Sequence, residues 1–139
     1  MLVVDASVLV TALADDDDDG GAIRDRLRGE RLAAPELVDL EVTSVLRRLV
    51  RSGHLSGRRA ELALTDLVEM PMQRASHRPL LPRCWALRDS ATGYDAAYVA
   101  LAEALGAVLL TADARLSRAP GLLCHVELVP RPGGRRARG

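Results

Sequence analysis

The sequence predicts an α/β protein, a three-layer α/β/α sandwich around a mainly parallel sheet of about four to five short strands. Three observations predict it. Short apolar runs, each long enough for one buried strand, alternate with stretches of helical periodicity. Two of these runs lead into an aspartate, Asp5 and Asp113. The 139 residues also suit one domain of ordinary size, with a substantial core.

The first expected element is a buried strand that delivers Asp5 at its carboxyl end, where parallel α/β sheets bind ligands. A short helix over residues 7–14 follows, with Asp5 or Ser7 as its cap. The acidic run Asp15–Asp19, together with the two glycines after it, predicts a solvated loop, because like charges repel and paired glycines break helices. A second short helix is expected over residues 22–28.

The middle of the chain predicts two short strands and two long helices. A strand is expected at residues 31–34, and Pro35 should open the next helix, since proline favours the first helical position. That helix covers residues 36–51 with apolar residues at helical spacing, and Gly53 ends it. Beyond it we expect a helix over residues 56–70, stopped by Pro71, and a strand over residues 72–75.

The last third contains the clearest helix in the chain, which is apolar nearly all round and should therefore be buried. The expected elements are a helix near 83–89, the clear helix from Ala96 to Leu105, a strand at 107–110, a helical turn to Arg118 and a strand near 124–128. We expect residues 1–128 to form the domain. The Pro-, Gly- and Arg-rich tail, residues 129–139, is expected to be disordered.

Composition narrows the function classes. The formal net charge is zero, so the molecule as a whole has no field that attracts polyanions. There is no lysine, which excludes Schiff-base and phosphate-loop lysine chemistry, while arginine favours bidentate phosphate contacts. Phenylalanine is absent and aromatics are 2% of the chain, so the core should be aliphatic and base-stacking platforms are nearly unavailable.

The two cysteines, Cys84 and Cys124, lie far apart without metal-binding spacing, and we expect reduced thiols. The amino terminus lacks the basic region of a signal peptide. No apolar run approaches the roughly 20 residues that span a bilayer. These features predict a cytoplasmic protein without a membrane segment.

Four acidic residues are candidates for a functional site, and three have structural explanations as well. Asp5 and Asp113 could each cap the helix that follows. Asp95 comes three residues after Thr92, the spacing of a capping box, and suits the first turn of its helix. Taken alone, each of these three is as readily structural as catalytic.

Glu41 is harder to explain structurally. In its helix the residues three or four positions away are Leu37, Val38 and Val45, so Glu41 projects from a largely apolar stripe. Burying an unpaired carboxylate costs several kcal/mol or forces it to take up a proton. A buried arginine partner or a bound cation would each resolve this.

The combination of acids favours the cation. Asp5 and Asp113 follow apolar strands and should lie at one edge of the sheet, and Asp95 leads the helix before the second strand. Converging carboxylates repel one another unless a divalent ion neutralises them. An all-oxygen site suits Mg²⁺ or Mn²⁺, whereas zinc prefers His or Cys. The histidines show no ligand spacing; they are His54, His77 and His125.

Four segments in this order resemble the PIN-domain family, and specifically the VapC-type toxins of bacterial toxin–antitoxin pairs. They are Val3-Val4-Asp5-Ala6-Ser7, Leu37-Val38-Asp39-Leu40-Glu41-Val42, Tyr94-Asp95-Ala96-Ala97-Tyr98-Val99-Ala100-Leu101-Ala102 and Leu110-Thr111-Ala112-Asp113. Each segment is short and individually weak, but the order and spacing are fairly specific. The match is collinear over roughly residues 1–128.

The resemblance implies a Mg²⁺-dependent endoribonuclease, with Mn²⁺ as a possible substitute, that acts as a homodimer and has a cognate antitoxin. It implies Asp5, Glu41 and Asp95 as the main metal ligands and Asp113 as a fourth acid. Ser7 and Thr111 match hydroxyl positions that support the site, and the metal would activate a water for in-line attack on a phosphodiester. The dense run Asp15–Asp19 departs from the family pattern and would hinder RNA if it lies near the site.

With no net positive charge, RNA binding has to come from local arginines. The candidates are Arg47, Arg48 and Arg51 on one helix, for which an ordinary solvated face is the favoured interpretation, and Arg135, Arg136 and Arg138 in the tail. The helices over residues 36–51 and 56–70 are the expected surface for a dimer partner or the antitoxin.

Two further function classes stay open. Aspartyl-phosphate enzymes also place an aspartate after the first strand. However, receiver domains need a lysine, and the phosphatases need a second aspartate where this chain has Ser7. A PIN-like binding module without activity is the non-enzyme alternative, against which the presence of all four acids argues. A dinucleotide-binding Rossmann domain is excluded by the lack of its glycine motif.

Overall fold

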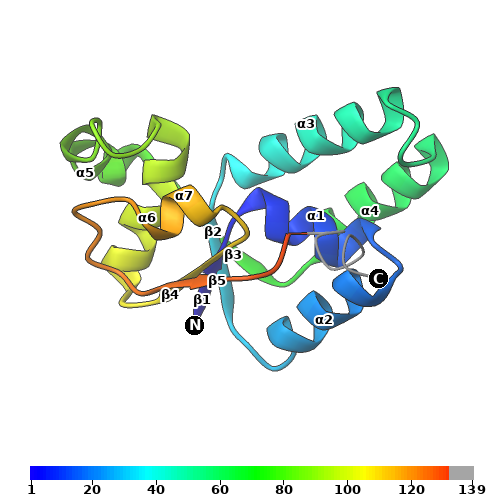
Figure 1. Cartoon of the computed structure of the whole chain (residues 1–139), viewed down its shortest axis with the longest axis horizontal. Coiled ribbons are helices and arrows are strands. Elements are labelled where there is room, and N and C mark those ends of the chain that lie inside the picture. The colour runs from blue at the N-terminus through cyan, green and yellow to red at the C-terminus, as the bar shows by residue number, and fades with distance from the viewer. Residues whose placement is uncertain (132–139) are drawn as a thin grey trace.

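A computed structural model describes residues 1–131 of the chain. Its five strands form one parallel sheet in the order β3-β2-β1-β4-β5, which confirms the predicted α/β sandwich (Figure 1). The strands are β1 (Leu2–Val4), β2 (Leu32–Pro35), β3 (Met72–Ala75), β4 (Val108–Thr111) and β5 (Val126–Leu128). The helices are α1 (Ala6–Ala14), α2 (Asp18–Leu27), α3 (Val38–Arg51), α4 (Gly57–Glu69), η1 (Arg78–Leu80), α5 (Leu81–Ala86), α6 (Gly93–Leu105) and α7 (Ala114–Ser117).

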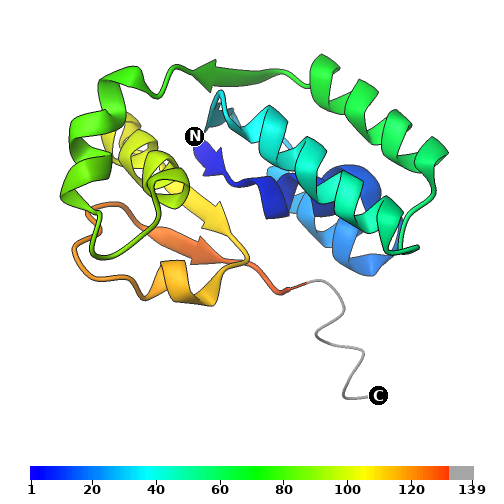
Figure 2. The same ribbon diagram turned by 90° about the horizontal axis from the view of Figure 1, so that it is seen from above.

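The helices lie on both sides of the sheet (Figures 1 and 2). Helix α6 packs on β1, β2 and β4 and is covered by α5. Helix α1 contacts β4 and packs against α2, α3 and α4. The apolar surface of α6, predicted from its sequence, is accounted for by this position between the sheet and α5.

The strand order reverses at the centre of the sheet. Chain order runs outward from β1 through β2 to β3 on one side, and from β4 to β5 on the other. The register pairs Val4 of β1 with Leu110 of β4. The two strands therefore end together, and in open parallel sheets the carboxyl ends of strands at such a reversal are the usual place for a ligand site.

The core is aliphatic, as predicted, with one exception. Valine, leucine and alanine dominate the buried residues, but Tyr98 on α6 is only 2% exposed. A buried tyrosine needs a partner for its hydroxyl. Both cysteines are free thiols, with Cys84 buried and Cys124 half-buried. None of the helices within residues 1–131 is long and apolar enough to cross a membrane.

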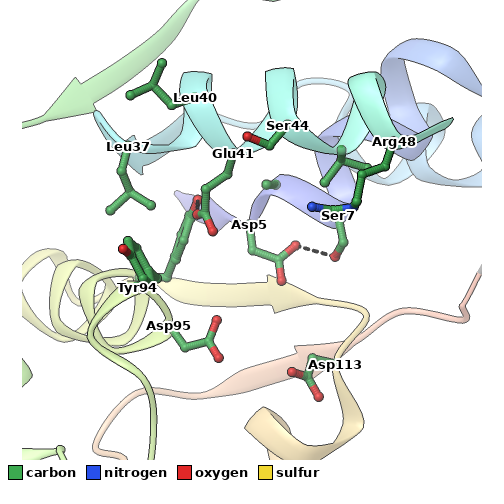
Figure 3. Close-up of a pocket in the computed structure, with 13 residues that line it drawn as sticks. Asp5, Ser7, Leu37, Leu40, Glu41, Ser44, Arg48, Tyr94, Asp95 and Asp113 are labelled. Atoms are coloured by element: carbon green, nitrogen blue, oxygen red, sulfur yellow. Dashed lines mark hydrogen bonds between the residues drawn. The ribbon is translucent and has the colours of Figure 1, made fainter. Parts of the chain in front are cut away.

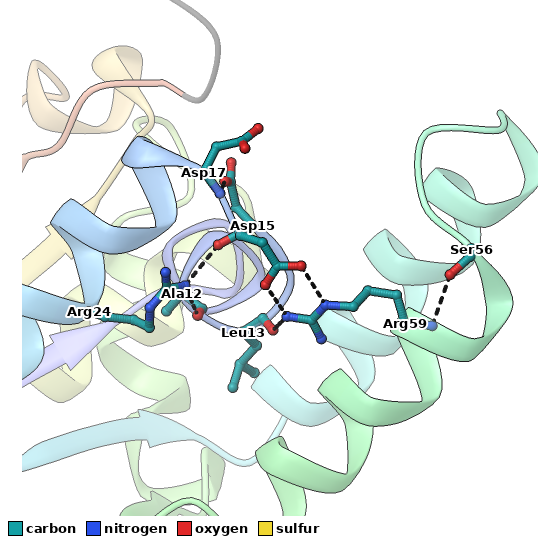
Figure 4. Close-up of polar contacts among 8 residues, drawn as sticks. Ala12, Leu13, Asp15, Asp17, Arg24, Ser56 and Arg59 are labelled. Carbon is teal, nitrogen blue, oxygen red and sulfur yellow. Dashed lines mark hydrogen bonds and ion pairs between the residues drawn. The ribbon is translucent and has the colours of Figure 1, made fainter.

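The prediction of a loop over the acidic run and both glycines is right for Asp15–Asp17 and wrong beyond them, because α2 begins at Asp18 and includes Gly20 and Gly21. Two arginines bind the carbonyls at the end of α1 and so order the junction (Figure 4). Arg24 donates to the carbonyls of Ala12 at 3.0 Å and Asp15 at 2.8 Å, and Arg59 donates to that of Leu13 at 2.7 Å. Acids in the first turn of α2 are favourable for the helix dipole.

Position 20 of this helix requires glycine, because any larger residue would collide with the backbone of Asp15. A Cβ at Gly20 would lie 1.9 Å from the carbonyl oxygen of Asp15, whereas one at Gly21 would meet nothing closer than 3.9 Å. The acidic residues are also not all solvated freely, since Asp16 accepts two hydrogen bonds from Arg59. Gly20 therefore allows α2 to approach the end of α1 closely, and neither glycine breaks the helix.

Pro35 was also assigned wrongly, since it is the last residue of β2 and α3 begins at Val38. Pro35 pairs in register with Ala75 of β3, and the next backbone amide, that of Glu36, donates to the Ala75 carbonyl. The strand can end on proline because the following amide makes this hydrogen bond. Helix α5 also begins earlier than predicted, at Leu81, whereas α6 begins at Gly93 directly after its cap Thr92, as the spacing of Thr92 and Asp95 predicted.

At the carboxyl end, Val129 is buried and its amide donates to the Thr111 carbonyl at 2.8 Å. Residues 132–139, which include most of the expected tail and the RNA-binding candidates Arg135, Arg136 and Arg138, lie outside the described residues. The division into residues 1–128 and a tail stays a prediction.

Candidate active site

Four acidic residues line one pocket of about 550 Å³ at the reversal point of the sheet (Figure 3). Asp5 follows β1, Asp113 follows β4, Glu41 lies on α3 and Asp95 lies in the first turn of α6. Figure 3 shows their carboxylates facing the same space from different sides. The structure thus brings together all four acids singled out in the sequence.

Asp5 is held by three hydrogen bonds. Its Oδ1 accepts from the Ser7 hydroxyl at 2.7 Å and from the Val8 amide at 3.1 Å, so it caps α1 as expected. Its Oδ2 accepts from the Thr111 hydroxyl at 2.5 Å. Both hydroxyls singled out in the sequence therefore contact this one carboxylate and fix its orientation.

Asp113 is tied to the same network through the backbone. Its amide donates to the Thr111 hydroxyl oxygen at 3.0 Å, so Thr111 links Asp5 to the segment that carries Asp113. The Asp113 Oδ1 accepts from the amides of Arg115 and Leu116 and caps α7. The structural role predicted for Asp113 is therefore present, alongside its position in the pocket.

Glu41 has neither a buried arginine partner nor full exposure. Its Oε1 accepts a hydrogen bond from the buried Tyr98 hydroxyl at 2.5 Å. Burial raises the pKa of the Glu41 carboxyl, the Tyr98 hydrogen bond opposes that rise, and the charges of Asp95 and Asp5 add to it. Burial and the same carboxylate raise the pKa of Tyr98 well above its usual range, so its hydroxyl stays a donor.

Asp95 combines a structural and an electrostatic feature. Its backbone amide donates to the Thr92 hydroxyl at 3.1 Å, as the predicted cap requires. Burial raises the pKa of its carboxyl, and the charges of Asp113 and, more weakly, Asp5 raise it further. The protein thus holds Glu41 and Asp95 in a place that disfavours two negative charges.

The chemistry of this set fits a divalent cation. The available ligands are carboxylate oxygens, and their mutual repulsion is relieved by positive charge. Within residues 1–131 no three Asp, Glu, His or Cys side chains already form a closed group that could hold a metal. Mg²⁺ usually keeps several waters and binds through one or two carboxylates, so this open arrangement is compatible with it. None of the three histidines lines this pocket.

Sequence reasoning missed several residues of the pocket, chiefly on α3 and α6. Tyr98 lies one turn after Asp95 on α6, so the helical period could have placed both on one side. On α3 the residues at helical spacing around Glu41 also line the pocket. These are Leu37, Ser44, Val45 and Arg48, of which Arg48 was already a candidate for RNA binding and only Ser44 was not singled out in the sequence. Neither Arg47 nor Arg51 lines it.

The acidic run lies next to the site. A neighbouring pocket of about 930 Å³ shares Ser7, Val45 and Asp113 with the first and is also lined by Asp15, Asp16 and Asp17. The run was expected to hinder RNA if it lies near the site, and three of its five acids do lie near it.

The model of the PIN domain family matches residues 2–122. The chain therefore belongs to the PIN domain family. PIN-domain ribonucleases generally depend on a divalent metal, which agrees with the donor set of the pocket.

Within the family, the chain is 44% identical over 128 residues to Ribonuclease VapC1 of Mycobacterium tuberculosis, covering 91% of this chain and 96% of that one. Among solved structures, PAE2754 from Pyrobaculum aerophilum shares 26% identity and a TM-score of 0.67, covering 90% of this chain and 81% of that one. VapBC2 from Rickettsia felis, bound to a DNA fragment from their promoter, has a TM-score of 0.65 at 14% identity. The match covers 91% of this chain and 97% of that one. The last likeness shows the fold alone.

Proposed function

We propose that this chain, a VapC-type endoribonuclease, hydrolyses RNA phosphodiester bonds at the pocket formed by Asp5, Glu41, Asp95 and Asp113. The observation that carries the assignment is the convergence of four carboxylates, from four separate elements, on one pocket at the strand-order reversal. Similarity to Ribonuclease VapC1 over nearly the whole of both chains supports the reaction class.

The four acids have distinguishable tasks. Asp5 is the most firmly oriented ligand, since Ser7 and Thr111 both donate to its carboxylate. Glu41 is kept in place by Tyr98, and Asp95 faces it from α6. Glu41 and Asp113 are the candidates for orienting and deprotonating the attacking water.

The metal that we propose is Mg²⁺, with Mn²⁺ as a substitute, held by these four acids. When bound, it supplies positive charge to the phosphate under attack and lowers the pKa of its water. The protein's own part is to hold the carboxylates that place the ion and to keep Ser7 and Thr111 bonded to Asp5. An oxygen-only ligand set disfavours zinc.

The partners follow from the same family. We propose a cognate antitoxin, a homodimer and a cytoplasmic location. Helices α3 and α4 are the proposed contact surface, and they present apolar side chains to solvent. Leu40 is 73% exposed and Val68 is 78% exposed. Co-expression with the antitoxin gene expected nearby, followed by size-exclusion chromatography, tests both partner proposals.

The catalytic proposal is tested by incubating the purified chain with structured RNA, with Mg²⁺ and then with excess chelator. Asp5→Asn and Asp95→Asn should abolish cleavage. Asp25→Asn is the matched control, because Asp25 is an acid on α2 outside the pocket whose only described ion pair is the exposed one with Arg28. Asp25→Asn should cut like the wild type.

Three outcomes separate the alternatives. Metal-dependent cleavage that both site variants lose supports the proposal. Equal cleavage by wild type and site variants identifies a contaminating nuclease. Failure to cut any of several RNAs favours the inactive binding module. An aspartyl-phosphate phosphatase is disfavoured because Ser7, at the position of the second aspartate, donates its hydroxyl to Asp5.

A further inference from the structure

The pocket described above has a strongly uneven charge. Of the 13 residues that line it, four are acidic, and Arg48 is the only basic one. An RNA phosphate entering this space would be repelled by every carboxylate that an ion does not neutralise. A cation of the protein's own at the pocket would lower this repulsion, and the chain has no lysine. Arg115 lies nearby but is already paired with Asp113, at 3.9 Å.

Arg48 is placed for this task by the geometry of α3. It lies seven residues after Glu41, which is two helical turns and about 10 Å along the axis. Both side chains line the same pocket (Figure 3). Ser44 and Val45, which lie between them in the sequence of α3, line it as well. Arg48 is thus on the same side of α3 as Glu41, with its backbone two turns further along the helix.

The guanidinium of Arg48 is also available. It is exposed, and within residues 1–131 it takes part in no hydrogen bond or ion pair. Other arginines of the fold are engaged: Arg59 by Asp16, and Arg74 by Asp39. An unpartnered arginine beside four carboxylates lowers the repulsion that a polyanion meets, and its planar fork matches a phosphate.

We propose that Arg48 binds a backbone phosphate of the RNA substrate at a distance from the bond that is cut, and so positions the strand across the acidic site. This inference rests on the proposed ribonuclease function. Because the backbone of Arg48 lies two helical turns beyond that of Glu41, the proposed contact is with a phosphate next to the one under attack. Its effect belongs to substrate binding and not to the hydrolysis step.

The same helix supplies matched controls. Arg47 and Arg51 are exposed arginines on α3 that do not line the pocket. Removing any one of the three changes the net charge equally, so a general electrostatic effect would appear in all of them. Only a specific contact would single out Arg48.

The experiment measures binding and cleavage separately for Arg48→Gln, Arg48→Lys, Arg47→Gln and Arg51→Gln. Binding of a short, fluorescein-labelled random-sequence RNA is followed by anisotropy in the Asp95→Asn background, over a range of salt concentrations. Steady-state cleavage of a structured RNA is measured in the wild-type background. Mn²⁺ binding without RNA is measured by calorimetry.

For Arg48→Gln we expect about tenfold weaker RNA binding and a correspondingly higher KM, with kcat within about twofold of wild type. The slope of log affinity against log salt should fall by about 0.7, the value for one lost phosphate contact with a single strand. Arg48→Lys should recover part of the affinity, because it keeps the charge but not the fork. Arg47→Gln and Arg51→Gln should match the parent, and Mn²⁺ affinity should not weaken in any of them.

The outcomes separate this inference from the proposed function. If wild type cuts RNA and Arg48→Gln behaves like Arg47→Gln, the role of Arg48 is overturned and the function stands. If RNA binds in an Arg48-dependent way but no cleavage occurs, the function fails and the contact stands. If RNA neither binds nor is cut, both fail. A loss confined to kcat would also overturn the positioning role.

Discussion

Removing the Tyr98 hydroxyl tests whether this buried side chain orients Glu41. In Tyr98→Phe the ring keeps its place in a position that is 2% exposed, and only the oxygen that donates to Glu41 at 2.5 Å is lost. A hydrogen bond to a charged group contributes about 1.5–3 kcal/mol, so the free energy of unfolding without metal should fall by about that amount at neutral pH. Removing a group that orients a metal ligand typically lowers metal affinity by roughly 10–100-fold, so Tyr98→Phe should weaken Mn²⁺ binding within that range.

The assay pairs urea denaturation of the metal-free protein with calorimetric titration of Mn²⁺. Tyr94→Phe is the matched control, since Tyr94 lies one turn earlier on α6, lines the same pocket and is 67% exposed, but within residues 1–131 its hydroxyl donates to none of the four acids. It should change the free energy of unfolding by less than about 0.5 kcal/mol and leave Mn²⁺ affinity unchanged. The same Tyr98→Phe change is then repeated in a Glu41→Ala background.

The double variant decides the cause. If the hydrogen bond is responsible, the stability loss from Tyr98→Phe should shrink greatly once Glu41 is absent. Equal losses in both backgrounds would refute the reasoning and assign the effect to core packing. Unchanged Mn²⁺ affinity in Tyr98→Phe would refute the orienting role separately.

Three further predictions concern stability. Gly20→Ala should destabilise by about 1–3 kcal/mol, because its Cβ would lie 1.9 Å from the Asp15 carbonyl, whereas Gly21→Ala should be neutral or stabilise by up to about 1 kcal/mol; equal losses in urea denaturation would contradict this. Without metal, Asp95→Asn should increase the free energy of unfolding by on the order of 1 kcal/mol and raise the melting temperature accordingly. It should also remove the stabilisation that Mg²⁺ gives the wild type. A lower melting temperature without metal would count against this prediction. The folded-state pKa values of Asp95 and Glu41 are raised, so these two carboxyls should destabilise the fold least below about pH 4 and increasingly as pH rises from there toward the raised pKa values. The difference in the free energy of unfolding between the wild type and an Asp95→Asn, Glu41→Gln double variant should therefore widen over that pH window. A constant difference would argue against the raised pKa values.

Local pattern and chain topology were sufficient to predict the outline of the site. Asp5 and Asp113 each follow an apolar run, and parallel strands end at one edge, so their proximity could be predicted without coordinates. Glu41 was recognisable because its helix is apolar on that side. The placement of Asp95 in the first turn of α6 followed from its spacing to Thr92.

The errors arose where a distant residue changes the meaning of a local signal. Paired glycines usually break a helix, but Gly20 allows close approach to Asp15, and Arg24 binds the end of α1. Pro35 usually favours a helix start, but its pairing with Ala75 of β3 keeps it in the strand. Neither contact is visible in a short window of sequence.

The sequence by itself determined the class of fold, the succession of strands and helices along the chain, and the four acids. These depend on hydrophobic periodicity and on short-range signals around each strand end. Only the tertiary structure decided what surrounds the acids. The hydroxyl of Tyr98 bonds to Glu41, 57 positions away in the chain. Arg48 lines the pocket and Arg47 and Arg51 do not, because only one side of α3 faces it. The reason is physical: the rotation of a packed helix and the partner of a buried polar group are set by contacts between elements, and these form only when the whole chain folds.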